Sequence, residues 1–203
     1  MNDFDSLYNF ETQIANFFGA QYGIGVDCCT HGIEMCIRLN SDTREILCPK
    51  QTYISIPFML EKISANYKFV DSEWSEYYYL TSTVIDSATL WRRNSYINGT
   101  LMCISFHIKK HINIGRGGMI LLDNYSDYKK LQKMRYDGRS IYDGVMYNDD
   151  DISDIGYHYY MTPEVAADGL KIFEQKKDIL PKTVTYKDYA DITQFSYFKN
   201  KYK

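Results

Sequence analysis

The chain has 203 residues and a formal net charge of −3 at pH 7, which predicts one domain and disfavours a nucleic-acid binder that works by general electrostatic attraction. Hydrophobic residues make up 45% and charged residues 24%, as is typical of a globular protein with its own core. The five cysteines show no paired ligand spacing, so they predict reduced core thiols and no metal. No apolar run could span a bilayer and residues 1–10 lack signal-peptide features, which predicts a cytoplasmic protein without a membrane partner.

The apolar pattern predicts alternating helices and strands. Phe10, Ile14, Phe17 and Phe18 recur at helical spacing, which indicates an amphipathic helix over residues 5–18. Short apolar runs typical of buried strands follow at residues 23–26, 45–48, 67–70, 83–85, 101–106 and 119–122. Helices between several of these runs favour an α/β fold with a mostly parallel sheet flanked by helices.

The second half of the chain carries fewer signals. We expect a helix over residues 127–135, an acidic loop over residues 143–154, and a helix start at Thr162 and Pro163, an N-cap followed by proline. Tyrosines then alternate with lysines. Residues 1–180 are therefore predicted to form a compact domain, and residues 181–203 a tail that docks on a partner subunit or is disordered.

A lysine segment lies between two of the predicted strands. The sequence SFHIKKHINIGRGGMILLD, residues 105–123, places Lys109 and Lys110 between apolar runs and before a glycine-rich turn. A lysine at the mouth of a sheet can lose solvation and attack a carbonyl, as in Schiff-base enzymes. A solvated basic loop between paired strands explains the same residues, so this segment alone leaves both interpretations open.

The segment resembles the lysine motif of the DegT/DnrJ/EryC1/StrS family of pyridoxal-phosphate-dependent sugar aminotransferases, roughly S-F-H-x-x-K-x-x-x-x-G-E-G-G-M. On this resemblance Lys110 carries the cofactor and Ser105 contacts its phosphate, because only Lys110 has the family's spacing to Ser105 and Gly115. Arg116 replaces the usual Glu.

Two earlier segments resemble the family's phosphate and ring contacts. Residues 25–39 are similar to its strand, tight turn and helix start, so Thr30 and the adjacent Cys29 are candidates for the phosphate site. The segment CPKQTYISIP places Tyr53 at the aromatic residue that stacks on the pyridine ring.

Two later segments extend the resemblance. The segment TVIDSATLW places Asp86 at the carboxylate that pairs with the ring nitrogen, with Thr89 at the position usually held by Gln or His. In GYHYYM, His158 replaces the Asn that reaches the partner subunit's cofactor phosphate, and Tyr160 replaces an Arg. The resemblance thus implies a homodimer with shared active sites.

The chain also departs from the family's pattern. Relatives carry a further strand and one or two helices between Asp71 and Thr83, and they continue after Glu174 into a small second domain. The resemblance therefore implies a reduced version of the fold-type-I large domain, without the C-terminal small domain. Compact versions occur among viral and phage proteins, which suggests the cytoplasm of a virus-infected cell as the setting.

The resemblance implies an aminotransferase that uses pyridoxal 5'-phosphate, a keto nucleotide-sugar substrate and glutamate as amino donor. Two alternatives stay open. The chain could be a non-catalytic protein that keeps the cofactor cradle, because several substrate contacts of the family are replaced. It could also be a phosphate- or nucleic-acid-binding module that uses the basic loop.

Overall fold

The computed structural model of the protein describes residues 4–40, 45–141 and 152–201. The elements are α1 (Asp5–Phe18), β1 (Tyr22–Val26), α2 (Cys29–Leu39), β2 (Ile46–Pro49), α3 (Ser55–Lys62), β3 (Tyr67–Val70), β4 (Tyr78–Tyr79), β5 (Val84–Asp86), β6 (Leu101–Ser105), β7 (Gly118–Leu122), α4 (Tyr125–Arg135), α5 (Pro163–Lys176), η2 (Tyr186–Asp188), η3 (Ile192–Gln194) and α6 (Ser196–Lys201). Every strand predicted from an apolar run is present, and the predicted helix over residues 5–18 is confirmed. Residues 143–151 of the predicted acidic loop lie outside the described residues.

The α/β class is confirmed, but the strand directions differ from the expectation of a mostly parallel sheet. The main sheet has the order β1-β7-β6-β5-β4, and only β5 and β6 pair in parallel in it. Direct returns of the chain, such as residues 106–117 between β6 and β7, give antiparallel neighbours, whereas a parallel pair needs a crossover. The parallel pair β2 and β3 forms a second sheet, whose Leu47 N–H donates to the Leu80 carbonyl beside β4 at 2.9 Å.

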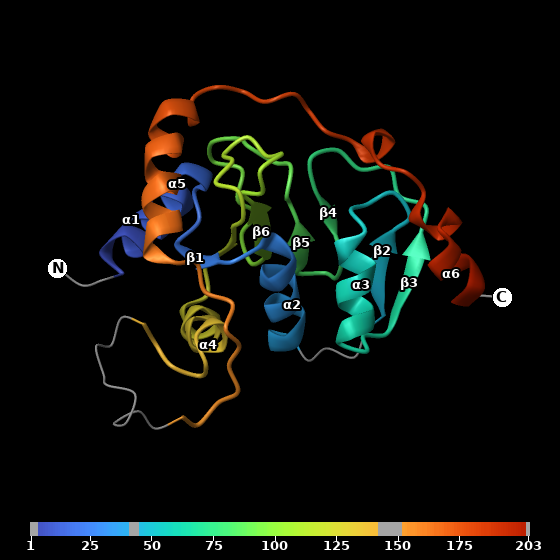
Figure 1. The fold of residues 1–203 in the computed structure, drawn as a ribbon, viewed down its shortest axis with the longest axis horizontal. Coiled ribbons are helices and arrows are strands. Elements are labelled where there is room, and N and C mark those ends of the chain that lie inside the picture. Colours follow the sequence, from blue (N-terminus) through green and yellow to red (C-terminus); the bar gives the residue numbers. More distant parts are fainter. Residues whose placement is uncertain (1–3, 41–44, 142–151, 202–203) are drawn as a thin grey trace.

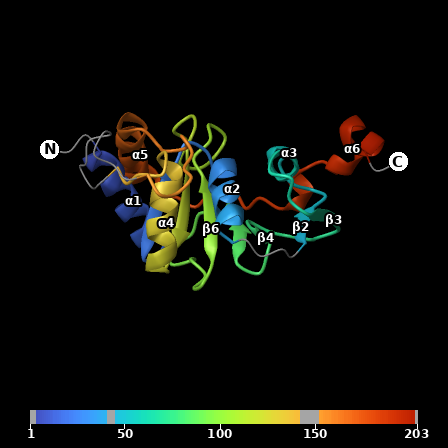
Figure 2. The ribbon, with the colours of Figure 1, turned by 90° about the horizontal axis from the view of Figure 1, so that it is seen from below.

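The main sheet is covered on both faces by apolar side chains. In β6 and β7, alternate residues enter one core with α1 and α5, and the residues between them enter a second core with α2 and α4. This alternation follows from the two-residue period of a strand. Helices α1 and α5 lie together at one end of the molecule, and β2, β3, α3 and α6 lie at the other (Figures 1 and 2). Within the described ranges, no helix combines the length and apolarity needed to cross a membrane.

The C-terminal segment packs on its own chain. After α5 it crosses the molecule towards β3 (Figure 1). The Glu76 N–H donates to the Val184 carbonyl at 2.8 Å, and the Ile192 N–H donates to the Lys50 carbonyl at 2.9 Å. Ile192 and Phe198 are buried. Residues 181–201 thus pack in part on their own chain, whereas Phe195 and Tyr197 stay exposed, at 45% and 51%. Docking of this tail on a partner subunit stays a prediction.

Candidate active site

One cavity of about 640 Å³ is lined by residues from distant segments of the chain. Its lining includes seven of the eight residues predicted for the cofactor site: Cys29, Thr30, Tyr53, Asp86, Thr89, Ser105 and Lys110. They come from the start of α2, the residues before α3, the end of β5 and its following turn, the end of β6, and the loop from residue 106 to residue 117. His158 does not line this cavity.

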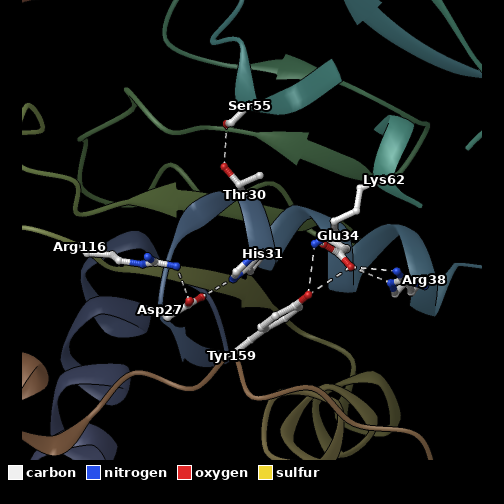
Figure 3. A network of polar contacts seen from close by, with 9 residues as sticks. All are labelled: Asp27, Thr30, His31, Glu34, Arg38, Ser55, Lys62, Arg116 and Tyr159. Carbon is white, nitrogen blue, oxygen red and sulfur yellow. Dashed lines mark hydrogen bonds and ion pairs between the residues drawn. The ribbon is translucent and has the colours of Figure 1, made fainter. Parts of the chain in front are cut away.

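The first turn of α2 forms one wall of the cavity. A Cβ on Gly118 would lie 2.4 Å from the Cys29 amide nitrogen, so β7 reaches the start of α2 only because residue 118 is glycine. The Cys29 thiol donates to the Cys103 carbonyl at 3.6 Å, which leaves its backbone N–H as its possible contribution to the site. The Thr30 and Ser55 hydroxyls are 2.8 Å apart (Figure 3). Backbone N–H groups and a hydroxyl at a helix N-terminus can bind a phosphate.

The lysine loop is held by its own backbone. The Phe106 N–H donates to the Gly117 carbonyl at 2.9 Å, and the Ile108 N–H donates to the Gly115 carbonyl at 3.0 Å. Gly115 has φ +84°, a left-handed conformation that favours glycine. Lys110 is half-buried and Lys109 is exposed. In the part of the chain that the structure describes, the Lys110 side chain makes no hydrogen bond or ion pair, and its charge acts on Asp86.

Asp86 is a buried carboxyl at the end of β5. Burial raises the pKa of Asp86, against the hydrogen bonds from Tyr78 and from the Ala88 N–H and the charge of Lys110, which lower it. The Tyr78 hydroxyl donates to Asp86 Oδ2 at 2.6 Å, and the Ala88 N–H donates to Oδ1 at 3.0 Å. A carboxylate has about four acceptor positions, so Asp86 keeps capacity for a donor from the cavity.

The remaining predicted residues lie in different surroundings. Tyr53 is 59% exposed at the rim of the cavity, where its ring is open to a ligand. The Thr89 hydroxyl donates to the Glu76 carbonyl at 2.8 Å, so its proton is already used. The His158 side chain is 70% exposed, and its Nδ1 lies 3.0 Å from Asp137 Oδ2. His158 therefore does not serve the cavity of its own chain.

A second polar cluster at the start of α2 was not predicted. Asp27 accepts from Arg116 at 2.8 Å and lies 2.7 Å from His31 Nδ1 (Figure 3). Burial raises the pKa of Asp27, but His31 and Arg116 lower it more. Asp27, Cys28 and His31 also offer ligand atoms within 4.8 Å of one another, as a metal site would. Because both Asp27 oxygens already have partners, the geometry favours an ion-pair network over a metal. The only sequence signal was Arg116 in place of the family's Glu.

Comparison with protein families supports the resemblance found in the sequence. The model of the DegT/DnrJ/EryC1/StrS aminotransferase family matches residues 2–89 and 88–183. The chain belongs to this family. No curated protein matches the chain in a sequence search.

Solved structures share its fold at low sequence identity. AtS13 from Actinomadura melliaura has a TM-score of 0.74 and 17% identity over 85% of this chain and 60% of its own. The sugar aminotransferase CalS13 from Micromonospora echinospora has a TM-score of 0.70 and 16% identity over 87% of this chain and 62% of its own. GDP-4-keto-6-deoxymannose-3-dehydratase with bound GDP-perosamine has a TM-score of 0.63 and 15% identity over 84% of this chain and 61% of its own. The chain thus spans about three fifths of these proteins.

Family membership implies pyridoxal phosphate as the cofactor. The cavity fits that group in three respects: a helix N-terminus with hydroxyls suits the phosphate, a buried carboxyl suits a protonated ring nitrogen, and an unpaired lysine suits the aldehyde. An exposed tyrosine at the rim completes the set.

Proposed function

We propose that the protein is a pyridoxal-phosphate-dependent sugar aminotransferase that acts on a keto nucleotide sugar, with glutamate as amino donor. The observation that supports it best is the convergence of Lys110, Asp86 and Thr30 on one cavity from distant parts of a chain of this family. Neighbours of the same fold include a sugar aminotransferase and a dehydratase with a bound GDP-sugar. The nucleic-acid-binding alternative has no comparable support.

Each residue has a defined role in this proposal. Lys110 holds the cofactor, and its free amine is the base that moves a proton at the amine-bearing carbon. Asp86 pairs with the protonated ring nitrogen, Tyr53 stacks on the ring, and Thr30 and Ser105 bind the phosphate. Bound pyridoxal phosphate supplies an electron sink for the negative charge left when that proton departs.

Asp86 is the negative partner for a positive group in the cavity. The Asp86 carboxyl is buried, so pairing with a positive group in the cavity would relieve the cost of its burial.

Cys29 and Thr89 fit less direct roles, because the Cys29 thiol and the Thr89 hydroxyl already donate to backbone carbonyls. We expect Cys29 to contribute its backbone N–H.

A half-reaction tests the proposed function. The protein is loaded with pyridoxal phosphate, freed of excess cofactor and mixed with glutamate. One equivalent of 2-oxoglutarate per loaded site should form, whereas the Lys110→Ala variant should form none. If the cofactor binds but no oxo acid forms, either from glutamate or from any other amino acid tried, the result would instead favour a non-catalytic protein.

A further inference from the structure

We propose that Tyr78 is a positioning residue of this site, whose hydroxyl is held by Thr52 and keeps the Asp86 carboxylate fixed and anionic. The inference rests on the proposed function, because Asp86 is the group that would pair with the cofactor. Tyr78 lies between Asp71 and Thr83, a stretch in which the chain departs from its family's pattern.

Strand pairing brings Tyr78 to Asp86. Strand β4 runs antiparallel to β5, and Tyr78 is directly opposite Asp86 in the register. Residues opposite each other in such a pair project their side chains to the same face. The Tyr78 hydroxyl can therefore reach Asp86 Oδ2, at 2.6 Å. A shift of one residue would turn the hydroxyl to the other face, so the pairing itself specifies the contact.

The Asp86 carboxylate fixes the direction of the hydrogen bonds. The Thr52 hydroxyl is within hydrogen-bond distance of the Tyr78 hydroxyl. A tyrosine hydroxyl has one proton, and an anionic carboxylate only accepts, so Tyr78 donates to Asp86 and Thr52 donates to Tyr78. All three residues are buried, at 3% exposure for Thr52, 7% for Tyr78 and 6% for Asp86. Each side chain has little contact with solvent, so each lost donor would leave a buried acceptor without its partner.

The charge of Asp86 depends on a small number of groups. Burial raises the pKa of Asp86, while Tyr78, the Ala88 N–H and Lys110 act against burial. The other titratable groups that face it are Cys29, Cys48, Cys103 and Tyr189, and burial raises the pKa of each, which keeps them neutral near pH 7. Removing the Tyr78 hydroxyl therefore shifts Asp86 towards its protonated form, which pairs less well with a protonated ring nitrogen.

Infrared titration of the cofactor-free protein tests the inference directly. The carboxylic-acid band of Asp86 is the band that the Asp86→Asn variant lacks. In Tyr78→Phe this band should persist to higher pH than in the wild type, and Thr52→Val should give a smaller change of the same sign. Tyr79→Phe is the control, because Tyr79 lies on the same strand but is 43% exposed. An unchanged Asp86 titration in Tyr78→Phe and Thr52→Val would overturn the proposal.

Cofactor affinity provides the second measurement. Tyr78→Phe should weaken pyridoxal phosphate binding about tenfold, as expected for one lost hydrogen bond to a charged group. The same substitution in the Asp86→Asn background should have almost no further effect, because Tyr78 acts through Asp86. Equal weakening in both backgrounds would indicate a structural role and contradict the proposal. If the wild type binds no pyridoxal phosphate, the proposed function fails, and the infrared titration still decides whether Tyr78 controls Asp86.

Discussion

At the scale of single residues, Lys109 and Lys110 are neighbours that both line the cavity, but they differ in surroundings. Lys110 is half-buried and its positive charge lowers the pKa of Asp86, whereas Lys109 is exposed. A lysine that faces a buried carboxyl is better placed to meet a ligand held between them. The difference makes the two residues a matched pair for labelling.

We predict that pyridoxal phosphate reacts with Lys110. Borohydride reduction of the loaded protein, followed by peptide mass spectrometry, should place the label on Lys110 alone. Lys110→Ala should lose the label and the visible absorbance, and Lys109→Ala should keep both. A label on Lys109, or on neither residue, would refute the assignment.

We also predict a pH-dependent contribution of His31 to stability. Burial lowers the pKa of His31, but its hydrogen bonds to Asp27 and Cys28 raise it by more. The pKa therefore rises from 6.5 to about 9. Because the folded pKa is the higher one, this stabilisation is fully present below pH 6.5 and is lost as the pH rises through about 9.

Urea unfolding at several pH values measures this contribution. The difference in unfolding free energy between the wild type and His31→Gln should be largest near pH 6 and shrink towards pH 9.5. Asp27→Asn should show a similar trend, because it removes the partner. A difference that does not change with pH would contradict the prediction.

At the scale of elements, a buried ion pair joins α1, β1 and α4. Glu11 of α1 pairs with Arg135 at the end of α4, and both side chains are at most 3% exposed. The Gly25 N–H of β1 donates to Glu11 at 2.7 Å, and Arg135 donates to the Gly25 carbonyl at 2.9 Å. Three elements thus share one polar contact inside the core.

Removing one member of this pair should destabilise the fold. Glu11→Ala leaves the Arg135 charge buried, which typically costs about 3–5 kcal/mol of unfolding free energy. Glu174→Ala is the control, since Glu174 pairs with Lys177 on the surface and should have little effect. Urea denaturation of both variants measures the difference. Comparable stability of Glu11→Ala and Glu174→Ala would show that the buried pair does not hold α1 in place.

At the scale of the whole molecule, the position of His158 motivates the prediction of a shared-site dimer. The residue is exposed and does not line its own chain's cavity, whereas the family resemblance assigns its position to a partner subunit's phosphate site. We predict that the working unit is a homodimer in which His158 of one subunit completes the site of the other.

Mixing two variants tests this assembly. Lys110→Ala and His158→Ala should each be impaired, but a heterodimer contains one site with both native residues. Part of the cofactor affinity or activity should therefore return after subunit exchange. A monomer by light scattering, or exchange without recovery, would reject the shared site.

The sequence by itself determined the positions of α1 and of six strands, because the period of apolar residues is a local property of the chain. The helix at residues 5–18, the six apolar strands and the start of α5 at Thr162 and Pro163 are all confirmed. The spacing around Lys110 likewise identified the family, because the motif is a run of residues close together in the chain.

Only the tertiary structure decided several of the contacts between distant segments. The largely antiparallel pairing, the docking of the tail, the Glu11–Arg135 ion pair and the contact of Tyr78 with Asp86 all join residues through the packing of separate elements. Tyr78 is the clearest case, since nothing distinguishes it from its neighbours Tyr77 and Tyr79 in the sequence. Its importance arises from the register of β4 on β5, which depends on how the whole sheet is assembled.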